Sequence, residues 1–370
     1  MTLLIDASPL QSEHRLRGVG AYVRSLVTAI ESMGLQPQYL VSSDGAVNLL
    51  PQDRVTRVFR PHRPAQVYWM YNELALRAGL RRIRPSVFLA PDFNGLVTNP
   101  YGKTVSVLHD LTHLKLTRAA RSGGLSAHLD ALRWSVYNCK LQQADCILAI
   151  SESTRQDAIR LLGIHPDRLH VVHHGVDHCR FRPSRGRGPF AQHKPYFVQL
   201  GGRNDNKNQA RLLQAFVQVA HLDKDVELLF SGPWSAADLN WLQIETEHLR
   251  IQGRVRHLGY VPDHDLSSLY GNAVAFVFPS LEEGFGLPIL EAMASGAAVI
   301  TSDRSSLPEV AGSAALLVNP LDPADLAEAM LKVLTESDLS QQLRQAGLDR
   351  ARQFTWETTV QQTMTVIGRL

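Results

Sequence analysis

Two glutamates separated by seven residues, Glu283 and Glu291, are the first candidates for chemistry, because glycines at positions 284 and 286 accompany them. Glycine leaves a loop without side chains, so a ligand can approach the backbone closely. The N–H groups at the start of a following helix favour a negatively charged ligand, whereas carboxylates accept hydrogen bonds from hydroxyl groups. The stretch therefore predicts a site for a phosphate-linked sugar. The alternative is a surface glutamate plus a glutamate that complements a helix N-terminus.

The elements around these glutamates are predicted to be a strand, a glycine loop, a helix and a second strand. Residues 273–278 are apolar throughout, which is typical of a strand buried on both faces. Residues 287–295 predict a helix, with Pro288 in its first turn and Gly296 at its end. Residues 298–301 predict the next strand. This order is typical of an α/β fold with a parallel sheet.

A second glycine loop carries cations. Residues 201–208 spell G-G-R-N-D-N-K-N between a strand predicted at 196–200 and a helix predicted at 209–220. The backbone amides of such a loop can bind phosphate oxygens, and Arg203 and Lys207 can add charge-assisted hydrogen bonds. The loop therefore predicts a diphosphate site, with an ordinary surface position as the alternative for Arg203.

The first half of the chain offers two further candidates. A strand predicted at residues 103–109 ends at His109, and ligands of doubly wound α/β folds lie beyond the carboxyl ends of strands. His109 is therefore expected to face the ligand, with a structural histidine as the alternative. Gly18 and Gly20 form a loop before a helix predicted at residues 22–33, where backbone amides can contact phosphate or an acceptor. The alternative is a flexible turn. A dinucleotide fingerprint fits poorly, because its third glycine is missing and about a dozen residues separate the loop from the preceding strand.

The spelling E-G-F-G-L-P-I-L-E-A-M-A-S-G from Glu283 onward resembles the signature of the retaining glycosyltransferases of family GT4, which have the GT-B fold. In that family the first glutamate lies beside the donor sugar and the second binds the ribose of the nucleotide. The resemblance assigns these roles to Glu283 and Glu291. It extends to an H-D pair at His109, near the donor sugar, and to a glycine loop, here Gly18 and Gly20, that lines the cleft.

The cationic loop resembles the family's G-R-L-D-P-R-K-N, in which an arginine and a lysine neutralise the donor diphosphate. Lys207 matches the family lysine, whereas the arginine position aligns with Gly202 and places Arg203 one residue later. In related proteins the loop after the strand predicted at 255–258 holds the base, which points to Val261 and Asp263. A polar turn explains these residues equally well. The resemblance predicts four catalytic residues: His109, Glu283, Arg203 and Lys207. The predicted donor-binding residues are Gly18, Gly20, Gly202, Arg203, Lys207, Val261, Gly284, Phe285, Gly286, Leu287 and Glu291.

The resemblance implies an α/β protein of GT-B fold, in which two Rossmann-like doubly wound domains face a central cleft. We expect an acceptor-side domain at residues 1–183, a linker rich in Gly, Pro and charge at 184–194, and a nucleotide-sugar-binding domain at 195–353. Residues 354–370 are expected to form a helix that packs back on the first domain. A length of 370 residues suits two domains.

The implied activity is that of a retaining hexosyltransferase. It moves a hexose from GDP-mannose or a UDP-sugar to a saccharide or lipid-linked acceptor in polysaccharide or glycan biosynthesis. Asp223-x-Asp225 and Asp263-x-Asp265 have the spacing of a metal-binding triplet, but both lie in turn-like segments. We therefore expect no metal and no cofactor besides the donor. Two other function classes stay open: a nucleotide-sugar 2-epimerase of GT-B fold, and a non-catalytic nucleotide-sugar-binding partner of a polymer assembly complex.

The composition, 44% hydrophobic and 20% charged, is that of an ordinary globular chain. No run approaches the about 18 apolar residues of a transmembrane helix, the first residues lack the pattern of a signal peptide, and three cysteines without zinc spacing indicate a reducing compartment. We expect a cytoplasmic protein. Residues 1–183 hold 22 Lys and Arg and 14 Asp and Glu, a net charge of +8. Anionic lipid or a phosphorylated acceptor suits this charge; without a nucleic-acid motif, we expect no nucleic-acid partner.

A possible contact with the membrane surface centres on residues 74–84. Leu76, Leu80 and Ile83 are expected on one face of a helix there, and arginines on another. A peripheral membrane helix has this pattern, and so does an outer helix whose polar face is solvated. Gly79 weakens the helix and no Trp or Phe flanks its apolar side, which favours the solvated helix.

Overall fold

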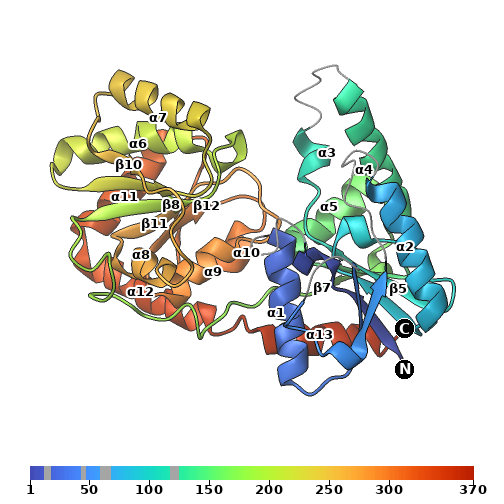
Figure 1. The fold of residues 1–370 in the computed structure, drawn as a ribbon. Helices are drawn as coiled ribbons and strands as arrows, with labels where there is room; N and C mark the ends of the chain where they lie inside the picture. The colour runs from blue at the N-terminus through green and yellow to red at the C-terminus, as the bar shows by residue number, and fades with distance from the viewer. Residues whose placement is uncertain (12–17, 43–46, 59–67, 117–124) are drawn as a thin grey trace. The chain divides into compact units, whose positions relative to one another are not determined.

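The computed structural model describes residues 1–11, 18–42, 47–58, 68–116 and 125–370 (Figure 1). The chain forms two compact units. Unit 1 comprises Met1–Gly175 and Trp356–Leu370, and unit 2 comprises Val176–Thr355. The chain therefore passes between the units twice, after Gly175 and after Thr355.

Unit 1 contains a seven-stranded sheet in the order β3-β2-β1-β4-β5-β6-β7, and every pair of neighbouring strands is parallel. The strands are β1 (Leu3–Asp6), β2 (Gln38–Ser42), β3 (Val55–Val58), β4 (Val87–Ala90), β5 (Lys103–Leu108), β6 (Cys146–Ala149) and β7 (Leu169–Val171). All residues of β1, β4 and β6 are buried, as expected for strands covered on both faces. The order reverses between β1 and β4, so the carboxyl ends of these strands mark the switch point where such folds bind ligands.

The helices of unit 1 are α1 (Gly18–Ser32), α2 (Tyr68–Ile83), α3 (Thr112–Leu116), α4 (Leu125–Gln143), α5 (Glu152–Leu162) and α13 (Trp356–Ile367). α5 begins after Ser151, whose side chain caps the helix by accepting a hydrogen bond from the backbone N–H of Thr154. Short 3₁₀ helices are η1 (Ser8–Gln11), η2 (Gln52–Arg54), η3 (Phe93–Gly95) and η4 (Pro166–Arg168).

The last helix, α13, belongs to unit 1 although 180 residues of unit 2 precede it. It packs against α1. The Trp356 ring stacks on the ring of His174 at 5.7 Å between centroids, and the Thr359 hydroxyl donates to the carbonyl oxygen of His173 at 2.8 Å. The C-terminal helix thus returns to the first unit, as the resemblance predicts.

Unit 2 repeats the same topology with six parallel strands in the order β10-β9-β8-β11-β12-β13. The strands are β8 (Tyr196–Leu200), β9 (Glu227–Ser231), β10 (Val255–His257), β11 (Ala275–Phe278), β12 (Val299–Ser302) and β13 (Leu316–Val318). The helices are η5 (Asp205–Lys207), α6 (Gln209–Leu222), α7 (Ala236–His248), α8 (Leu266–Asn272), α9 (Leu287–Ala294), α10 (Leu307–Ala311), α11 (Pro323–Thr335) and α12 (Ser337–Ala351). Here the order reverses between β8 and β11.

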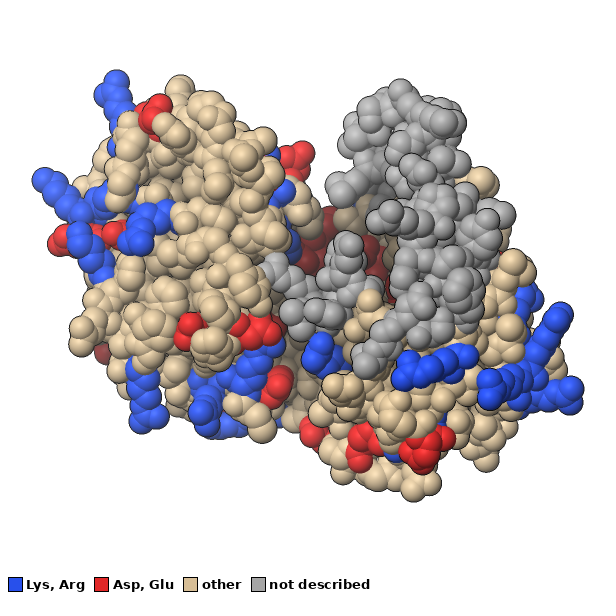
Figure 2. Space-filling model, viewed as in Figure 1, with Lys and Arg blue, Asp and Glu red and all other residues tan. Residues whose placement is uncertain are grey.

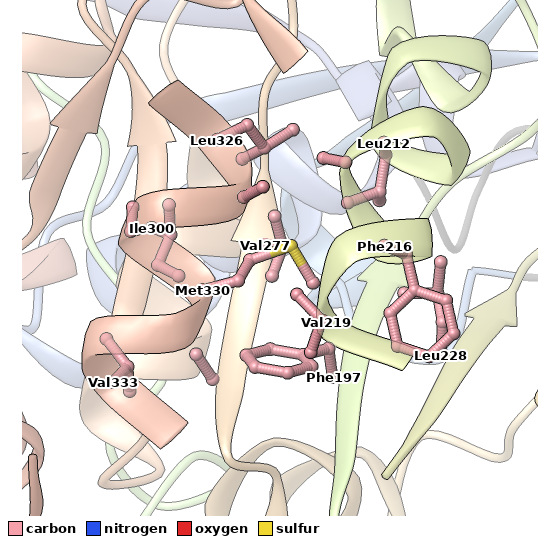
Figure 3. Packing of buried hydrophobic residues seen from close by; sticks show 14 of the residues in the cluster. Phe197, Leu212, Phe216, Val219, Leu228, Val277, Ile300, Leu326, Met330 and Val333 are labelled. Atoms are coloured by element: carbon pink, nitrogen blue, oxygen red, sulfur yellow. The ribbon is translucent and has the colours of Figure 1, made fainter. Parts of the chain in front are cut away.

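Apolar side chains from the sheet, from α6 and α11, and from Leu242 of α7 and Leu343 of α12 form a core cluster of unit 2, part of which Figure 3 shows. Phe216 of α6 and Met330 of α11 are both fully buried against side chains of the sheet, such as Phe197 and Val277. This packing holds the amino end of α6, and with it the cationic loop, at the carboxyl end of β8.

The segment 184–194, which the sequence predicts as a linker, makes hydrogen bonds to α8 inside unit 2. The N–H of Gly186 donates to Oδ1 of Asn272 at 2.7 Å, and Nδ2 of Asn272 donates to the carbonyl oxygen of Arg187 at 3.0 Å. The Ser268 hydroxyl donates to the same carbonyl at 2.8 Å. These contacts hold the segment on the second unit.

The apolar face of α2 points into unit 1. Leu76 and Leu80 are fully buried in its core, whereas Leu74 is 67% exposed. Among the described residues, no helix is long and apolar enough to cross a membrane. On the face seen in Figure 2, both positive and negative side chains lie over each unit, so charges of both signs are mixed there. The structure therefore supports the solvated-helix interpretation of residues 74–84.

Candidate active site

The two motif loops of unit 2 follow neighbouring strands. The cationic loop, residues 201–208, follows β8, and the glutamate loop, residues 279–286, follows β11. These two strands pair in parallel at the point where the strand order reverses. Because parallel strands present their carboxyl ends at one edge of the sheet, loops almost 80 positions apart in the chain come together there. Each loop is predicted by its own local residues, whereas their contact depends on the pairing of β8 with β11.

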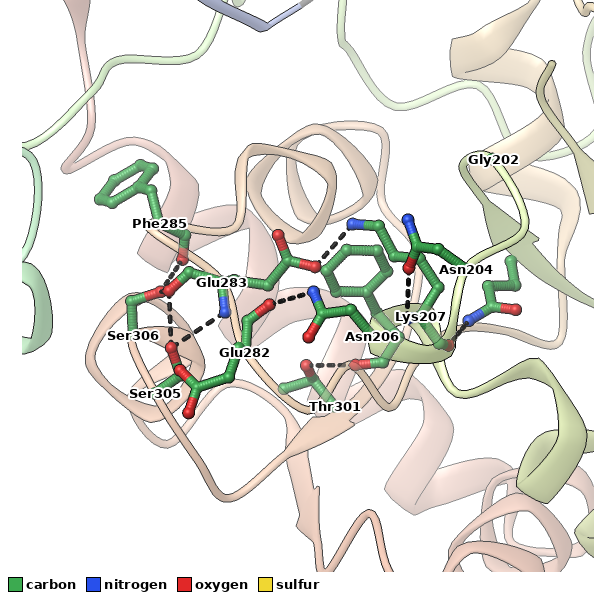
Figure 4. A network of polar contacts seen from close by, with 12 residues as sticks. Gly202, Asn204, Asn206, Lys207, Glu282, Glu283, Phe285, Thr301, Ser305 and Ser306 are labelled. Atoms are coloured by element: carbon green, nitrogen blue, oxygen red, sulfur yellow. Dashed lines mark hydrogen bonds and ion pairs between the residues drawn. The ribbon is translucent and has the colours of Figure 1, made fainter. Parts of the chain in front are cut away.

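Lys207 and Glu283 form an ion pair across the two loops. Nζ of Lys207 lies 2.6 Å from Oε1 of Glu283, and both side chains are less than one-fifth exposed. The same ammonium group lies 4.5 Å from the ring centroid of Phe278, the last residue of β11. A cation suited to phosphate and a carboxylate suited to sugar hydroxyls are thus in contact (Figure 4).

Backbone contacts lock the loops together. The carbonyl oxygen of Asn206 accepts from the N–H of Leu281 at 2.8 Å, and Nδ2 of Asn206 donates to the carbonyl oxygen of Glu282. Asn208, which is buried with a left-handed φ of 60°, donates through Nδ2 to the carbonyl oxygen of Pro279 at 3.1 Å. The two asparagines thus fix the position of Lys207 between them.

Arg203 makes its contacts on another side of the cationic loop. Its Nη1 lies 3.3 Å from Oδ1 of Asp238, and its guanidinium lies 4.1 Å from the ring centroid of Trp241, both on α7. Within the described part of the chain it forms no ion pair with Glu283. The preceding Gly202 accepts a hydrogen bond at its carbonyl oxygen from Nε2 of Gln209 at 3.2 Å. The structure therefore brings Lys207, but not Arg203, to the glutamate loop.

The glutamate loop needs its second glycine. Gly286 has a φ of 118° and caps α9, and a Cβ atom there would lie 2.9 Å from Cδ2 of Leu307. Phe285 is 3% exposed and its ring packs on that of Phe354 at 6.0 Å. α9 then begins at Leu287, as predicted. The half-buried Gly284 thus lies between an ion-paired carboxylate and a buried ring.

Glu291 lies one turn into α9 with a different environment. The Tyr270 hydroxyl donates to its Oε2 at 3.1 Å. Burial raises the pKa of Glu291, and the nearby positive charge of Arg180 partly opposes this rise. Arg180 in turn forms an ion pair of 2.9 Å with Asp263, which lies in the loop after β10 with the buried Val261. Arg180 thus interacts both with Asp263, in the loop predicted to contact the base, and with Glu291, which is predicted to bind the ribose.

In unit 1, His109 follows β5 directly, as predicted. Its Nε2 lies 2.8 Å from the carbonyl oxygen of Pro91, so Nε2 carries the proton and donates. Its ring meets the ring of Tyr22 edge-on at 5.0 Å and that of His174 at 5.6 Å. Burial lowers the pKa of His109, so the ring is neutral at pH 7 and its Nδ1 is the acceptor nitrogen.

The glycine loop of unit 1 differs from the prediction. α1 begins at Gly18, four residues earlier than the helix start expected at Tyr22. Gly18 has a φ of 53° and is exposed, whereas Gly20 is buried within the first turn. Glycine is unfavourable inside a helix, which is why the sequence predicted a loop. The amides of both glycines instead belong to the first turn of α1. Tyr22, whose ring contacts His109, follows in the same helix.

Several residues that support this site carry no sequence pattern that predicts their contacts. Arg180 and Tyr270 act on Glu291, Asn206 joins the two loops, and Ser305 and Ser306 contact the glutamate loop. Their partners lie tens of positions away in the chain. The left-handed φ of 59° at Ser305 also escapes prediction, because a residue type other than glycine does not reveal such a conformation.

Two family models match this chain. Residues 16–180 match the model described as Glycosyltransferase Family 4, and residues 181–350 match the model described as Glycosyl transferases group 1. The chain is 35% identical over 234 residues to the O-antigen chain mannosyltransferase B of Escherichia coli, covering 60% of each protein. It is 28% identical over 400 residues to the serotype-specific mannosyltransferase WbdA of Escherichia coli, covering 97% of this chain and 47% of that protein. The chain thus spans about half the length of these relatives.

Solved structures resemble the whole chain. The sucrose-phosphate synthase from Thermosynechococcus elongatus is 20% identical, with a TM-score of 0.82 over 100% of this chain and 98% of that one. HepE of Anabaena, solved in complex with UDP and glucose, is 18% identical, with a TM-score of 0.73 over the full length of both chains. At this identity the likeness concerns the fold, and it confirms the two Rossmann-like domains of the predicted GT-B architecture.

Proposed function

Since this chain belongs to the glycosyltransferases of GT-B fold, with a family 4 domain followed by a group 1 domain, we propose that it is a retaining mannosyltransferase. Its donor is GDP-mannose, and its acceptor is a saccharide or a lipid-linked saccharide of polysaccharide biosynthesis. The observation that carries the proposal is the contact between Lys207 and Glu283 at the switch point of unit 2. The choice of mannose rests on the relatives in Escherichia coli, which are named as mannosyltransferases.

Each side chain of the site has a role in this proposal. Lys207 stabilises the charge that develops on the leaving diphosphate, together with the positive end of the α9 helix dipole. Arg203 adds positive charge at the same loop. Glu283 orients the sugar through its hydroxyl groups, and Glu291 binds the ribose diol. The acceptor oxygen attacks the face of the sugar that the diphosphate leaves, the bond from the anomeric carbon to the phosphate oxygen breaks, and the departing phosphate takes the acceptor proton.

Other backbone and side-chain groups complete the donor and acceptor sites. Val261 and its loop contact the base through backbone groups, and Gly202 leaves space for the diphosphate. In unit 1, Nδ1 of the neutral His109 accepts a hydrogen bond from a sugar hydroxyl. The helix start at Gly18 and Gly20 contacts the acceptor. Because Lys207 and backbone amides supply the stabilising charge, the proposed transfer requires no metal ion.

A screen of nucleotides tests the donor. GDP and GDP-mannose are expected to raise the melting temperature of the protein more than UDP, ADP or dTDP and their sugars, because ligands that bind only the folded state stabilise it. Product formation with a saccharide acceptor in the presence of EDTA then tests metal independence, and NMR of the product tests retention. If none of the nucleotides binds, the proposed function is wrong.

One observation favours a second candidate function, nucleotide-sugar 2-epimerisation, which requires titrating carboxyl groups in the first domain. Asp92 follows β4, beside the Pro91 carbonyl that binds His109, and burial raises its pKa to about 6. The negative charge of Asp6, at the end of β1, contributes to this rise. Formation of an isomeric nucleotide sugar without any acceptor would identify an epimerase, whereas a transferase forms no isomer. A non-catalytic partner would bind the donor without either reaction.

The proposal places the protein in the cytoplasm and includes electrostatic contact of unit 1 with an anionic membrane surface. Four arginines are exposed: Arg77 within α2, Arg81 and Arg82 in its last turn, and Arg84 just beyond its end. The apolar side of that helix is buried. Such a contact depends on charge and weakens with salt. Sedimentation with phosphatidylglycerol vesicles at low salt, absent with phosphatidylcholine vesicles and lost at 1 M salt, is the expected result.

A further inference from the structure

Ser305 and Ser306, between β12 and α10, bind the backbone of the glutamate loop (Figure 4). Oγ of Ser305 accepts from the N–H of Glu283 at 3.0 Å and donates to the carbonyl oxygen of the same residue at 2.6 Å. Oγ of Ser306 lies 2.9 Å from the carbonyl oxygen of Glu283 and 2.7 Å from that of Phe285. Two adjacent hydroxyl groups therefore satisfy both backbone polar groups of Glu283.

Ser305 has an unfavourable backbone conformation, and Ser306 is buried. Ser305 has a φ of 59°, a left-handed conformation that costs a non-glycine residue about 1 kcal/mol or more. Ser306 is completely buried, so its hydroxyl has no access to bulk water and depends on the loop for hydrogen bonds. A strained residue persists only where its surroundings hold it. For Ser305 these surroundings include the N–H and the carbonyl oxygen of Glu283.

The glutamate loop is also held from its other side. The carbonyl and the side-chain amide of Asn206 bind Leu281 and Glu282, and Lys207 binds the carboxylate of Glu283 itself. A donor diphosphate that takes hydrogen bonds from Lys207 must weaken that ion pair. With the ion pair weakened, the carboxylate of Glu283 depends for its direction on the backbone contacts from the serines.

We propose that Ser305 and Ser306 are positioning residues, which hold the backbone of Glu283 so that its carboxylate meets the donor sugar once the diphosphate occupies Lys207. The inference rests on the proposed function for the identity of the sugar and adds residues that touch no substrate. A positioning role and a purely structural role predict different effects on donor binding. Loss of the hydroxyl groups should affect the sugar part of the donor and leave binding of the nucleoside diphosphate intact.

Two variants and a matched control test the proposal. Ser306→Ala removes the buried hydroxyl, and Ser305→Gly removes the strained one while glycine adopts the same φ without cost. Ser302→Ala is the control, because Ser302 is also completely buried at the end of β12 but its Oγ accepts only a local hydrogen bond, from Arg304 N–H at 3.2 Å. Affinities for GDP and GDP-mannose are measured by calorimetry, and kcat and KM by transfer to a saccharide acceptor.

We expect GDP affinity in both variants to stay within about twofold of the wild type, while kcat falls about ten- to a hundredfold, the scale of a misplaced reacting group. The affinity advantage of GDP-mannose over GDP should shrink with it, and the control should match the wild type. Equal weakening of GDP and GDP-mannose, or unchanged kcat in both variants, would overturn the proposal.

Hydrogen exchange of the free protein provides a readout that needs no donor. Peptides that cover residues 279–287 should exchange faster in Ser306→Ala and in Ser305→Gly than in the wild type or in Ser302→Ala. In Ser305→Gly the N–H of Glu283 loses its acceptor, and in Ser306→Ala the carbonyl oxygens of Glu283 and Phe285 lose their hydroxyl partner. Unchanged exchange would refute the positioning role. If the wild type binds neither GDP nor GDP-mannose, the proposed donor is wrong, and the exchange data still decide whether the serines hold the loop.

Discussion

The ammonium group of Lys207 lies 2.6 Å from Oε1 of Glu283, although 76 positions separate the two residues in the chain. In the free protein, therefore, the cation proposed for the diphosphate is neutralised by the carboxylate proposed for the sugar. A donor that carries both a diphosphate and a sugar can replace this ion pair with two contacts of its own, one from the diphosphate to Lys207 and one from the sugar to Glu283. The pair thereby keeps the site ordered without leaving a buried charge unpaired before the donor arrives.

Replacement of Lys207 by alanine should weaken binding of GDP by at least about tenfold, because a charge-assisted hydrogen bond contributes about 1.5–3 kcal/mol. The change also leaves the half-buried Glu283 without its cation, so the melting temperature should fall. Calorimetry with GDP and thermal melting measure the two effects. Lys224→Ala, at an exposed position, is the control and should change neither quantity. GDP affinity equal to that of the wild type would contradict the assignment of Lys207.

Replacement of Glu283 by alanine should separate binding from transfer. The nucleoside diphosphate makes its proposed contacts with Lys207 and Glu291, so GDP affinity should stay within a fewfold of the wild type. The rate of transfer should fall about a hundredfold, because the sugar loses its orienting carboxylate. Glu291→Ala is the matched counterpart and should weaken GDP itself. The assignment of the two glutamates would be reversed if Glu283→Ala lost GDP binding and Glu291→Ala kept it.

Arg203→Ala should have a smaller effect on GDP binding than Lys207→Ala, because Arg203 is bound to Asp238 and stacked on Trp241. Loss of the stacked cation should lower the free energy of unfolding by about 0.5–1 kcal/mol. Chemical denaturation and GDP calorimetry on both variants provide the comparison. A larger loss of GDP affinity in Arg203→Ala would show instead that the guanidinium leaves α7 to bind the diphosphate.

The pH dependence of stability should report the burial of Glu291. Burial raises its pKa in the folded protein above the unfolded value, so the folded state binds the proton more tightly. Its stabilising contribution is therefore fully present below the unfolded pKa and is lost as pH rises through the folded pKa. Glu291→Gln keeps an acceptor for the Tyr270 hydroxyl and removes the charge. We expect it to raise the free energy of unfolding at pH 8.

At a pH below about 4, where the wild-type carboxyl is protonated in both states, the difference between Glu291→Gln and the wild type should vanish. The same variant should bind GDP more weakly at pH 8, because the ribose diol loses a charged acceptor. Denaturant melts at several pH values measure the first effect and calorimetry the second. A variant that is less stable than the wild type at pH 8 would show that Arg180 and Tyr270 outweigh the cost of burial.

Several elements of the fold could be predicted because their signals are local. An apolar run predicted the strand that ends at Phe278, and Pro288 and Gly296 bracketed the helix observed at Leu287–Ala294. Strands and helices in alternation predicted two parallel sheets, since such chains cross over through helices. The start of α1 was wrong by four residues because glycines are unfavourable within a helix, whereas Gly18 begins this one with a positive φ.

By itself, the sequence determined the types of the elements, the family resemblance and the identity of the chemical groups in the two motif loops, because each depends on residues close together in the chain. Only the tertiary structure decided what those groups touch. It paired Lys207 with Glu283, turned Arg203 towards α7 and set Ser305 and Ser306 on the backbone of Glu283. Such contacts depend on which strand ends become neighbours in the sheet, and no pattern of a few consecutive residues specifies that.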